Sequence, residues 1–206
     1  MKIILLVEGG TEQKALPAFF RRWLKGQHVD PLPAISAVNA EGCGNHIKEC
    51  ARRTELHLKN PDVIAVFGLL DIYGANNIPG HCRTVEEKCG HLRQLLEKEV
   101  GSPKFRQHFA VHELEAWLLS DPTIFPPAVR KGLPAKAARP ETVNSTEPPS
   151  KLLARLYRKA KDREYRKVTD GTSLFASLDP NLAYAKCKAL AALLDDMLAC
   201  LQAATS

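Results

Sequence analysis

A short apolar run near the start of the chain ends on an acid and two glycines, and this junction constrains the fold most. Five consecutive apolar residues, 3–7, predict a strand buried on both faces, as in a parallel sheet. Gly9 and Gly10 permit a sharp turn, and Thr11 is a candidate N-cap for a following helix. Glu8 is therefore expected at the carboxyl end of a strand, where open α/β sheets bind their ligands.

The same order of strand, turn and helix recurs through residue 121. Apolar segments at 33–40, 63–70 and 105–111 predict three more strands. Asn45, in a glycine turn after the first of them, is a candidate N-cap, and a capping box from Thr84 to Glu87 predicts the start of a helix between the other two. This alternation predicts an α/β core over residues 1–121, with a mainly parallel four-stranded sheet flanked by helices.

The composition changes after the core. Half of the fourteen prolines fall in residues 122–150, which predicts a proline-rich loop excursion with one short helix at 127–131. Residues 151–206 are expected to form a C-terminal helical segment that packs on the core. Within it, the sequence predicts a basic helix over 151–167, a turn at Asp170-Gly171, a short apolar segment over 173–178 and an amphipathic helix over 181–201.

The overall composition limits the classes of protein to which this chain can belong. The 206 residues are 45% hydrophobic and 25% charged, which is typical of a globular domain. The net charge of +6 is compatible with a polyanionic partner and equally with a merely soluble basic surface. The sequence contains no stretch apolar enough to span a bilayer, the run at 3–7 is too short for a signal peptide, and the six cysteines are scattered. We therefore expect a cytoplasmic protein with reduced thiols and no membrane contact.

Acids follow three of the four predicted strands: Glu8, Asp71, and Glu113 with Glu115. Neighbouring parallel strands lie about 4.8 Å apart, so side chains at adjacent carboxyl ends can converge on one ion. We expect the change from strand to helix to fall between Glu113 and Glu115, so that at least one of them points into the crevice. Gathered carboxylates raise each other's pKa, and Mg²⁺ or Mn²⁺ relieves this repulsion. The alternative is a set of unrelated caps and surface acids.

The segment from 151 to 167 is the one dense basic run in the sequence. Its cations predict either a surface that contacts a phosphate backbone or a solvated helix face, and both interpretations stay open. The candidates for nucleic-acid contact are Lys151, Arg155, Arg158 and Lys159.

Two of these motifs carry a resemblance to a known domain. The stretches around Glu8 and Asp71 resemble the first and second motifs of the Toprim domain, which occurs in topoisomerases, primases and OLD-type nucleases. Taken with later motifs, they are more similar to the Toprim-like domain-of-unknown-function family 4276, and the likeness covers most of the chain. The residues that carry it are Leu6-Val7-Glu8-Gly9-Gly10-Thr11-Glu12, Leu70-Asp71-Ile72-Tyr73-Gly74, His112-Glu113-Leu114-Glu115-Ala116-Trp117, Ser120-Asp121-Pro122, Tyr165, Lys167, Gly171 and Leu178-Asp179-Pro180.

The resemblance implies a Rossmann-like Toprim core that uses Mg²⁺ for phosphodiester chemistry. It makes Glu8 the general acid/base and Asp71 a metal ligand, but Tyr73 stands where the family's second metal-binding acid is expected. Glu113 or Glu115 would then supply the missing oxygen. The resulting candidates are Glu8, Asp71 and Glu113 as catalytic residues, Glu8, Asp71, Glu113 and Glu115 as metal ligands with Glu12 and Asp121 behind them, and Gly9, Gly10 and Thr11 as phosphate contacts.

These observations leave three functional hypotheses. The first is Mg²⁺-dependent phosphodiester chemistry on nucleic acid by a nuclease-like enzyme. The second is a catalytically impaired Toprim-fold module that binds nucleic acid or a protein partner, for which Tyr73 is the argument. The third is a small-nucleotide phosphohydrolase. Expected partners are nucleic acid, a second copy of the chain in a homodimer, and a partner protein of a phage-defence system.

Overall fold

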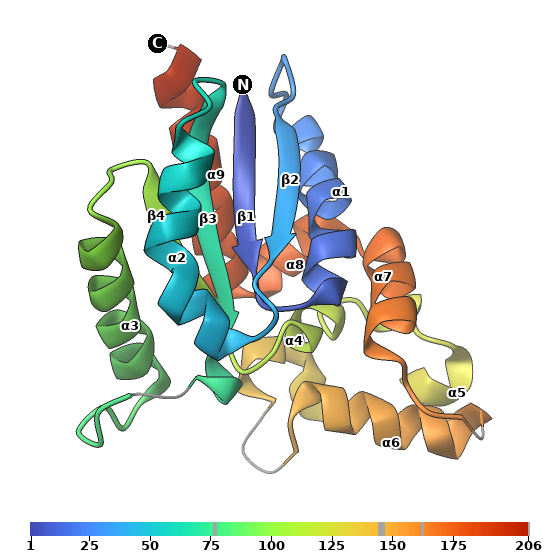
Figure 1. Cartoon of the computed structure of the whole chain (residues 1–206). Coiled ribbons are helices and arrows are strands. Elements are labelled where there is room, and N and C mark those ends of the chain that lie inside the picture. Colours follow the sequence, from blue (N-terminus) through green and yellow to red (C-terminus); the bar gives the residue numbers. More distant parts are fainter. Residues whose placement is uncertain (76–77, 144–146, 162, 206) are drawn as a thin grey trace.

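A sheet of four parallel strands, in the order β2-β1-β3-β4, forms the centre of the structure (Figure 1). The computed structural model describes residues 1–75, 78–143, 147–161 and 163–205. The parallel sheet with helices on both faces confirms the predicted α/β fold class, and each strand ends within one residue of its expected bounds. The strands are β1 (Lys2–Val7), β2 (Ala34–Asn39), β3 (Val63–Asp71) and β4 (Phe105–Ala110).

Helices connect the strands in the core and make up most of the remaining chain. The core helices are α1 (Gly10–Gly26), α2 (Cys43–Leu58) and α3 (Val85–Val100), with a 3-10 turn η1 (Ile72–Gly74) after β3. The later helices are α4 (Glu115–Leu118), α5 (Pro127–Arg130), α6 (Pro149–Lys161), α7 (Lys167–Ser177), α8 (Pro180–Lys186) and α9 (Lys188–Thr205), with 3-10 turns η2 (Pro122–Ile124), η3 (Ala135–Ala138) and η4 (Pro140–Thr142).

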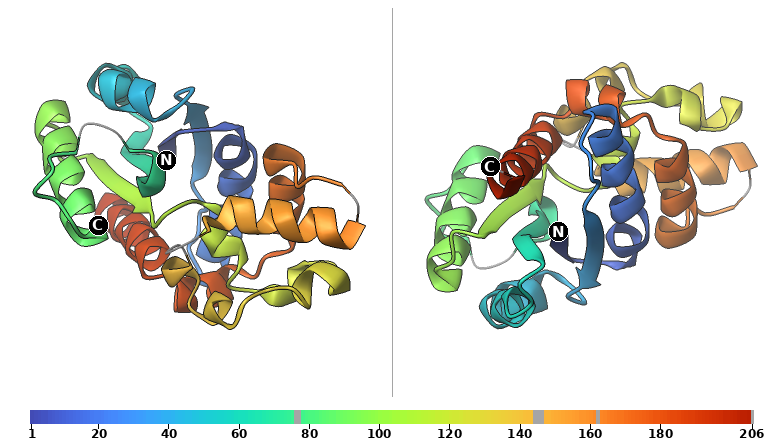
Figure 2. Two further views of the ribbon diagram at one scale, coloured as in Figure 1. Left: turned by 90° about the horizontal axis from the view of Figure 1, so that it is seen from below. Right: turned by 90° about the horizontal axis from the view of Figure 1, so that it is seen from above.

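Both faces of the sheet are covered, which explains why β1 is apolar from Ile3 to Val7. Ile3 and Leu5 of β1 belong to one hydrophobic cluster with α1 and the C-terminal helices, whereas Ile4 and Leu6 belong to a second cluster with α2 and α3. Figure 2 shows α2 and α3 on one side of the sheet and α1 and α9 on the other. Residues of the C-terminal helices thus belong to the hydrophobic cluster on one face of the sheet.

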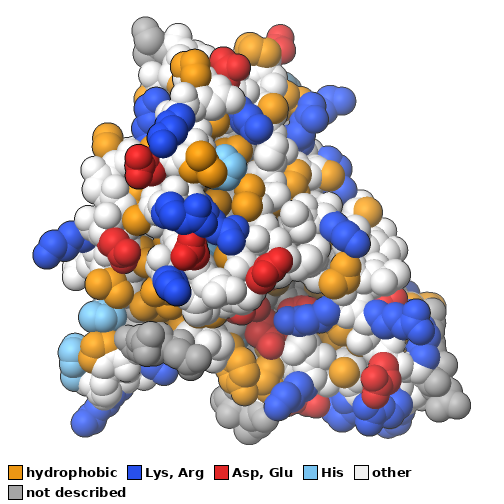
Figure 3. Space-filling model, viewed as in Figure 1, with side chains coloured by type: hydrophobic (Ala, Val, Ile, Leu, Met, Phe, Trp, Pro, Cys, Tyr) orange, Lys and Arg blue, Asp and Glu red, His pale blue; other side chains and the backbone are white. Residues whose placement is uncertain are grey.

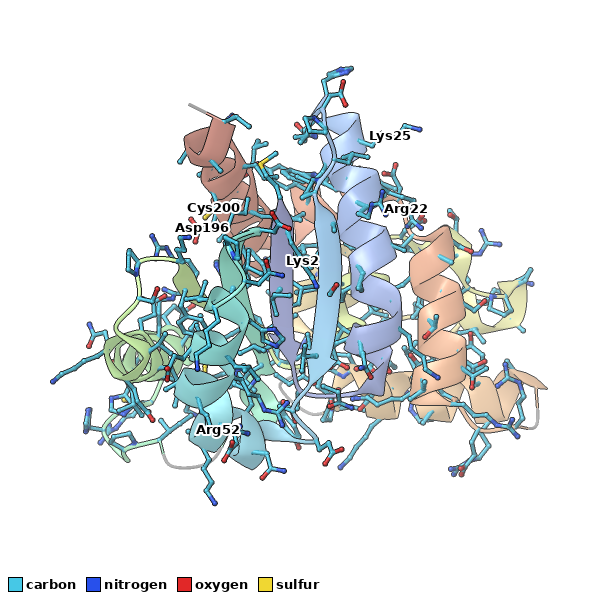
Figure 4. All side chains as sticks on the ribbon, turned by 45° about the horizontal axis from the view of Figure 1, so that its top comes forward. Lys2, Arg22, Lys25, Arg52, Asp196 and Cys200 are labelled. Atoms are coloured by element: carbon cyan, nitrogen blue, oxygen red, sulfur yellow. The ribbon has the colours of Figure 1, made fainter. Side chains whose placement is uncertain are left out.

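Helix α7 lies along α1, and one arginine joins them. The guanidinium of Arg22 on α1 donates hydrogen bonds to the carbonyl oxygens of Phe175, Ala176 and Leu178 at 2.8, 2.9 and 2.7 Å (Figure 4). Carbonyl groups at the end of a helix lack partners within it, so Arg22 caps α7 and fixes its end against α1.

Two predicted N-caps are wrong, because each helix begins at its glycine turn, before the residue that was expected to cap it. Helix α1 has extended Gly9 as its N-cap, and Thr11 lies inside the first turn with its side chain buried. Helix α2 has Gly42 as its N-cap, with a φ of 110° that favours glycine, rather than Asn45. The capping box at Thr84 and Glu87 is confirmed.

The C-terminal helices differ from their predicted bounds. The basic run is divided between α6 and α7. The expected turn at Asp170-Gly171 lies within α7, as does the segment 173–178 up to Ser177, where the helix ends. The predicted helix over 181–201 is interrupted at Cys187, whose φ of −118° and ψ of 98° are extended, so α8 and α9 are separate. The short helix expected at 127–131 is present as α5, and residues 144–146 of the loop excursion lie outside the described residues. Within the described part of the chain, no helix has the length and apolar character needed to cross a membrane.

Candidate functional site

The order of the strands creates a crevice at the carboxyl ends of β1 and β3. These strands are neighbours in the sheet, but the helices that follow them, α1 and α3, pack on opposite faces. The segments that follow the two strands therefore diverge, and a crevice forms between them. Open α/β sheets bind their ligands in such a crevice. Glu8 directly follows β1, and Asp71 is the last residue of β3.

Four carboxylates and one lysine line the small pocket in this crevice, which we call the carboxylate pocket. Its volume is about 200 Å³. Figure 3 shows acidic side chains in a hollow of the surface between the strands and α6. The charged residues of the carboxylate pocket are Glu8, Glu12, Asp71, Glu115 and Lys167.

Glu8 and Asp71 are joined directly. The backbone N–H of Asp71 donates a hydrogen bond of 3.3 Å to Oε2 of Glu8. Oδ1 of Asp71 accepts a second hydrogen bond, of 2.9 Å, from the N–H of Leu114 in the loop after β4. These contacts connect the carboxyl ends of β1, β3 and β4, so the first two predicted acids lie together as the strand order requires.

Glu12 enters the carboxylate pocket from the first turn of α1. Its carboxylate lies so close to Gly9 that a Cβ there would be 3.0 Å from Oε2 of Glu12. A side chain at position 9 would therefore displace this carboxylate, which gives the first glycine of the motif a second role besides turning the chain.

Glu115 and Lys167 form the ion pair of the pocket. Nζ of Lys167, on the first residue of α7, lies 3.2 Å from Oε2 of Glu115, on the first residue of α4. Glu115 is 1% exposed, and neither of its carboxylate oxygens has a partner with hydrogen-bond geometry among the described residues. A buried carboxylate with unfilled acceptor positions is an unusual arrangement that suits a cation or a protonated state.

Burial, with a smaller contribution from neighbouring carboxylates, raises the pKa values of the acids in this pocket. Burial, and then the neighbouring carboxylate of Glu12, raise the pKa of Asp71 well above its usual range. Burial raises the pKa of Glu115 to about 7, against the opposing effect of Lys167. Burial also raises the pKa of both Glu8 and Glu12. For Lys167, burial works in the opposite direction, but the carboxylates of Glu115 and Asp71 outweigh it and raise its pKa to about 12.

The family resemblance at Tyr165, Lys167 and Gly171 has a structural explanation in the position of Lys167. Gly171, one turn after Lys167 on α7, packs on α1 so closely that a Cβ there would lie 2.9 Å from Cγ2 of Thr11 and 3.2 Å from the hydroxyl of Tyr165. The close approach of α7 to α1 brings Lys167 to the pocket. Sequence reasoning placed Lys167 in the basic run and missed its role here, although its spacing from Tyr165 and Gly171 carried the signal.

Glu113 and Glu115 have separate environments, because the short helix α4 begins at Glu115. The carboxylate of Glu113 accepts hydrogen bonds from the N–H and the hydroxyl of Ser150, at 2.8 and 2.9 Å, at the start of α6. Glu113 thus fixes α6 and does not line the carboxylate pocket, whereas Glu115 does. Of the other candidates, Asp121 caps η2, and Tyr73 is 55% exposed outside the pocket lining.

The phosphate candidates fall into two groups. Gly9, Gly10 and Thr11 line the carboxylate pocket. The basic candidates of α6 are all exposed, but Arg155 forms a two-bonded ion pair with Glu147 and Arg158 pairs with Glu164. In the described part of the chain, Lys151 and Lys159 make no such pair, so they remain the cations of α6 best able to contact a phosphate.

The pocket has the right chemistry for a hard divalent cation, although its ligands are not assembled. Carboxylate oxygens are the donors that Mg²⁺ prefers, and those of Glu115 are unfilled. However, among the described residues no three Asp, Glu, His or Cys side chains are close enough together to hold a metal as they stand. Binding would therefore require the carboxylates to rotate toward one another on their fixed strand and helix ends.

Comparison with known proteins gives one family and a set of structural relatives. The model of the family described as "Domain of unknown function (DUF4276)" matches residues 7–198. The C-terminal region of the Burkholderia pseudomallei OLD protein is similar in structure, with a TM-score of 0.53 and 15% identity over 95% of this chain and 97% of that chain. The C-terminal region of the Xanthomonas campestris pv. campestris OLD protein has a TM-score of 0.47 and 14% identity, over 96% of each chain. Among curated proteins, no significant match is found. At these identities the first likeness shows a common fold.

Proposed function

The chain belongs to the DUF4276 family, and from that premise we propose that it hydrolyses phosphodiester bonds of nucleic acid with the help of Mg²⁺ at the carboxylate pocket. The observation that carries the proposal is the contact between the N–H of Asp71 and the carboxylate of Glu8, which joins the two Toprim-like motifs at the switch point of the sheet. Charge supports it as well, because four carboxylates face a single lysine in the carboxylate pocket.

The residues of the pocket have distinct proposed roles. Asp71, Glu12 and Glu115 would supply the carboxylate oxygens for the metal, so Glu12 takes the place predicted for Glu113. When bound there, a divalent ion would supply Lewis-acid chemistry toward a phosphoryl oxygen and a water molecule. Glu8 has a raised pKa, which suits a general acid that gives its proton to the leaving oxygen. Lys167 balances part of the negative charge while no substrate is bound.

The test is cleavage of single- and double-stranded DNA and RNA with Mg²⁺ or Mn²⁺. We expect Glu8→Gln and Asp71→Asn to lower the rate at least about a hundredfold, the usual range for a general acid or base. Glu55→Gln, which removes an exposed acid on α2, is the control and should cut like the parent. Equal cleavage by all three variants would overturn the proposal, and activity on free nucleotides alone would favour a small-nucleotide phosphohydrolase.

A non-catalytic module that binds nucleic acid is the second candidate. Two observations favour it: Tyr73 replaces the second metal-binding acid, and Nζ of Lys167 already lies 3.2 Å from Glu115. In this case nucleic acid should bind without turnover, and binding should not change when Mg²⁺ is removed with EDTA.

A further inference from the structure

A second and larger cavity lies beside the free edge of β4, away from the carboxylate pocket. We call it the β4-edge cavity. Residues of α3, the end of β4, η4, α8 and α9 enclose a volume of about 770 Å³. This volume falls within the range of roughly 300–1,000 Å³ that is usual for small-molecule sites. The two cavities have no lining residue in common.

Four cations line the β4-edge cavity, and none of them forms an ion pair with another described residue: Arg93, Arg139, Lys186 and Lys188. This differs from α6 and the loop after it, where Arg155, Arg158 and Arg163 are each paired with an acid. Unpaired cations that converge on one cavity favour an anionic ligand.

Two of the cations are held in place by backbone groups. Nε of Arg93 donates to the carbonyl oxygen of Gln107 at 3.1 Å, and Nζ of Lys186 donates to that of Ser120 at 2.6 Å. These bonds orient both side chains without neutralising their charge. A ligand therefore meets cations that are already partly ordered, which lowers the entropic cost of binding.

The two acids of the cavity do not cancel this charge. The carboxylate of Glu141 accepts hydrogen bonds of 3.0 and 3.2 Å from the N–H of Ala189, so it serves the start of α9. Glu86 is exposed in the first turn of α3, where the helix dipole favours an acid. The lining thus contains four cations against two acids that are stabilised by helix ends.

Much of the remaining wall is apolar, beside two histidines and a threonine. Val85, Phe109, Val111 and Ala192 line the cavity from α3, the end of β4 and α9. A flat apolar group fits against such a wall, while an attached anion reaches the cations at the rim. We propose that the β4-edge cavity binds a nucleotide, with its base against the apolar wall and its phosphate between Arg139 and Lys188.

Calorimetric titration with the four nucleoside monophosphates tests this proposal. EDTA is present, so that no metal bridges a phosphate to the carboxylate pocket. At least one nucleotide should bind with a stoichiometry of one per chain and a dissociation constant in the millimolar range or below. The matching nucleoside and inorganic phosphate should each bind at least about tenfold more weakly, because each lacks one half of the recognised group. Failure of all four nucleotides to bind overturns the proposal.

Variants locate the bound nucleotide. Arg139→Ala combined with Lys188→Ala should weaken binding at least about tenfold, whereas Lys14→Ala with Lys25→Ala removes equal charge from exposed positions of α1 and should not. Ala192→Trp should block the cavity and reduce binding while the protein stays folded by circular dichroism. Glu8→Gln should bind like the parent, which separates this cavity from the proposed nuclease site. Unchanged binding by both the arginine–lysine and the tryptophan variants overturns the proposal.

Discussion

Lys167 is the residue on which the charge balance of the carboxylate pocket depends most. It is the one cation in the lining of that pocket and pairs with buried Glu115. We expect Lys167→Met to lower the free energy of unfolding by about 1–3 kcal/mol at pH 8, less than a fully buried pair costs because the lysine side chain is 48% exposed. Urea unfolding measures the change.

A double variant separates the ion pair from simple packing. Combining Lys167→Met with Glu115→Gln removes both charges, so most of the lost stability should return. A loss of the same size in the Glu115→Gln background would show that Lys167 acts by packing alone and would contradict the proposed charge balance.

The raised pKa of Glu115 predicts a fall in stability with rising pH. The native state keeps a proton on Glu115 up to about pH 7, whereas the unfolded chain loses it near pH 4.5, so the native state binds more protons in this interval. Stability from this group is therefore lost as pH rises. Buried His46, whose pKa is lowered to about 4, has the opposite effect on stability at lower pH. We therefore expect the fall in stability to be clearest between pH 6.5 and 8.

The control for this prediction is Glu115→Gln. Urea unfolding at pH 6.5, 7.25 and 8 should give a flatter pH dependence for the variant than for the parent. If the two proteins lose stability in parallel, Glu115 does not titrate in this range.

The positions of single site residues could be predicted where those residues directly follow a strand. Glu8 and Asp71 directly follow apolar runs, and a parallel sheet brings such positions together. The separation of Glu113 from Glu115 was expected, but which of the two enters the pocket depended on the partner Ser150, 37 positions away from Glu113. The contribution of Lys167 depended on packing between α7 and α1, which local sequence does not specify.

At the scale of elements, the contact between α1 and α7 positions the pocket lysine. Gly171→Ala would place a Cβ 2.9 Å from Thr11, so α7 must move. We expect a loss of about 1–3 kcal/mol in unfolding free energy, as for other overpacked sites, together with a lower rate of the proposed cleavage reaction. Thermal unfolding and the cleavage assay measure these effects.

Gly90→Ala provides a matched comparison within a helix. Gly90 lies in α3, and a Cβ there has no atom within 4 Å, so alanine should stabilise the protein by about 0.5–1 kcal/mol. A similar response to both substitutions would mean that the close approach at Gly171 has no structural role.

The exposed face of α6 predicts how nucleic-acid binding depends on salt. Lys151→Ala and Lys159→Ala should each reduce the slope of log K against log salt by about 1, since each removes one phosphate contact. Arg155→Ala should change the slope less, because its guanidinium is held by Glu147. Binding by fluorescence anisotropy at several salt concentrations gives the slopes, and equal slopes for the parent and both lysine variants would exclude α6 as the contact surface.

Elements with a strong periodic signal were predicted well, and those set by distant packing were not. The four strands and the capping box of α3 followed from local patterns. The first turns of α1 and α2 began earlier because glycine N-caps replaced the expected Thr11 and Asn45. Gly171 was predicted to lie in a turn, but it lies within α7. Glycine is needed there because a larger side chain would not fit against α1.

For the molecule as a whole, the order of the strands decides the site. Because β1 and β3 are neighbours while their helices pack on opposite faces, acids that are 63 positions apart in sequence come into contact. The sequence predicted this fold class and the convergence of Glu8 with Asp71. It did not predict that α7 would line the site from the C-terminal segment, because that arrangement depends on contacts between separate parts of the chain.

A crystal structure with bound Mn²⁺ tests the central proposal most directly. The anomalous signal of Mn²⁺ locates the ion without reference to any assay. We predict one strong peak within coordination distance of carboxylate oxygens from Asp71 together with Glu12 or Glu115, and its loss in Asp71→Asn. A peak elsewhere on the molecule, or no peak at millimolar Mn²⁺ with Lys167 still against Glu115, would contradict a metal-dependent site at this end of the sheet.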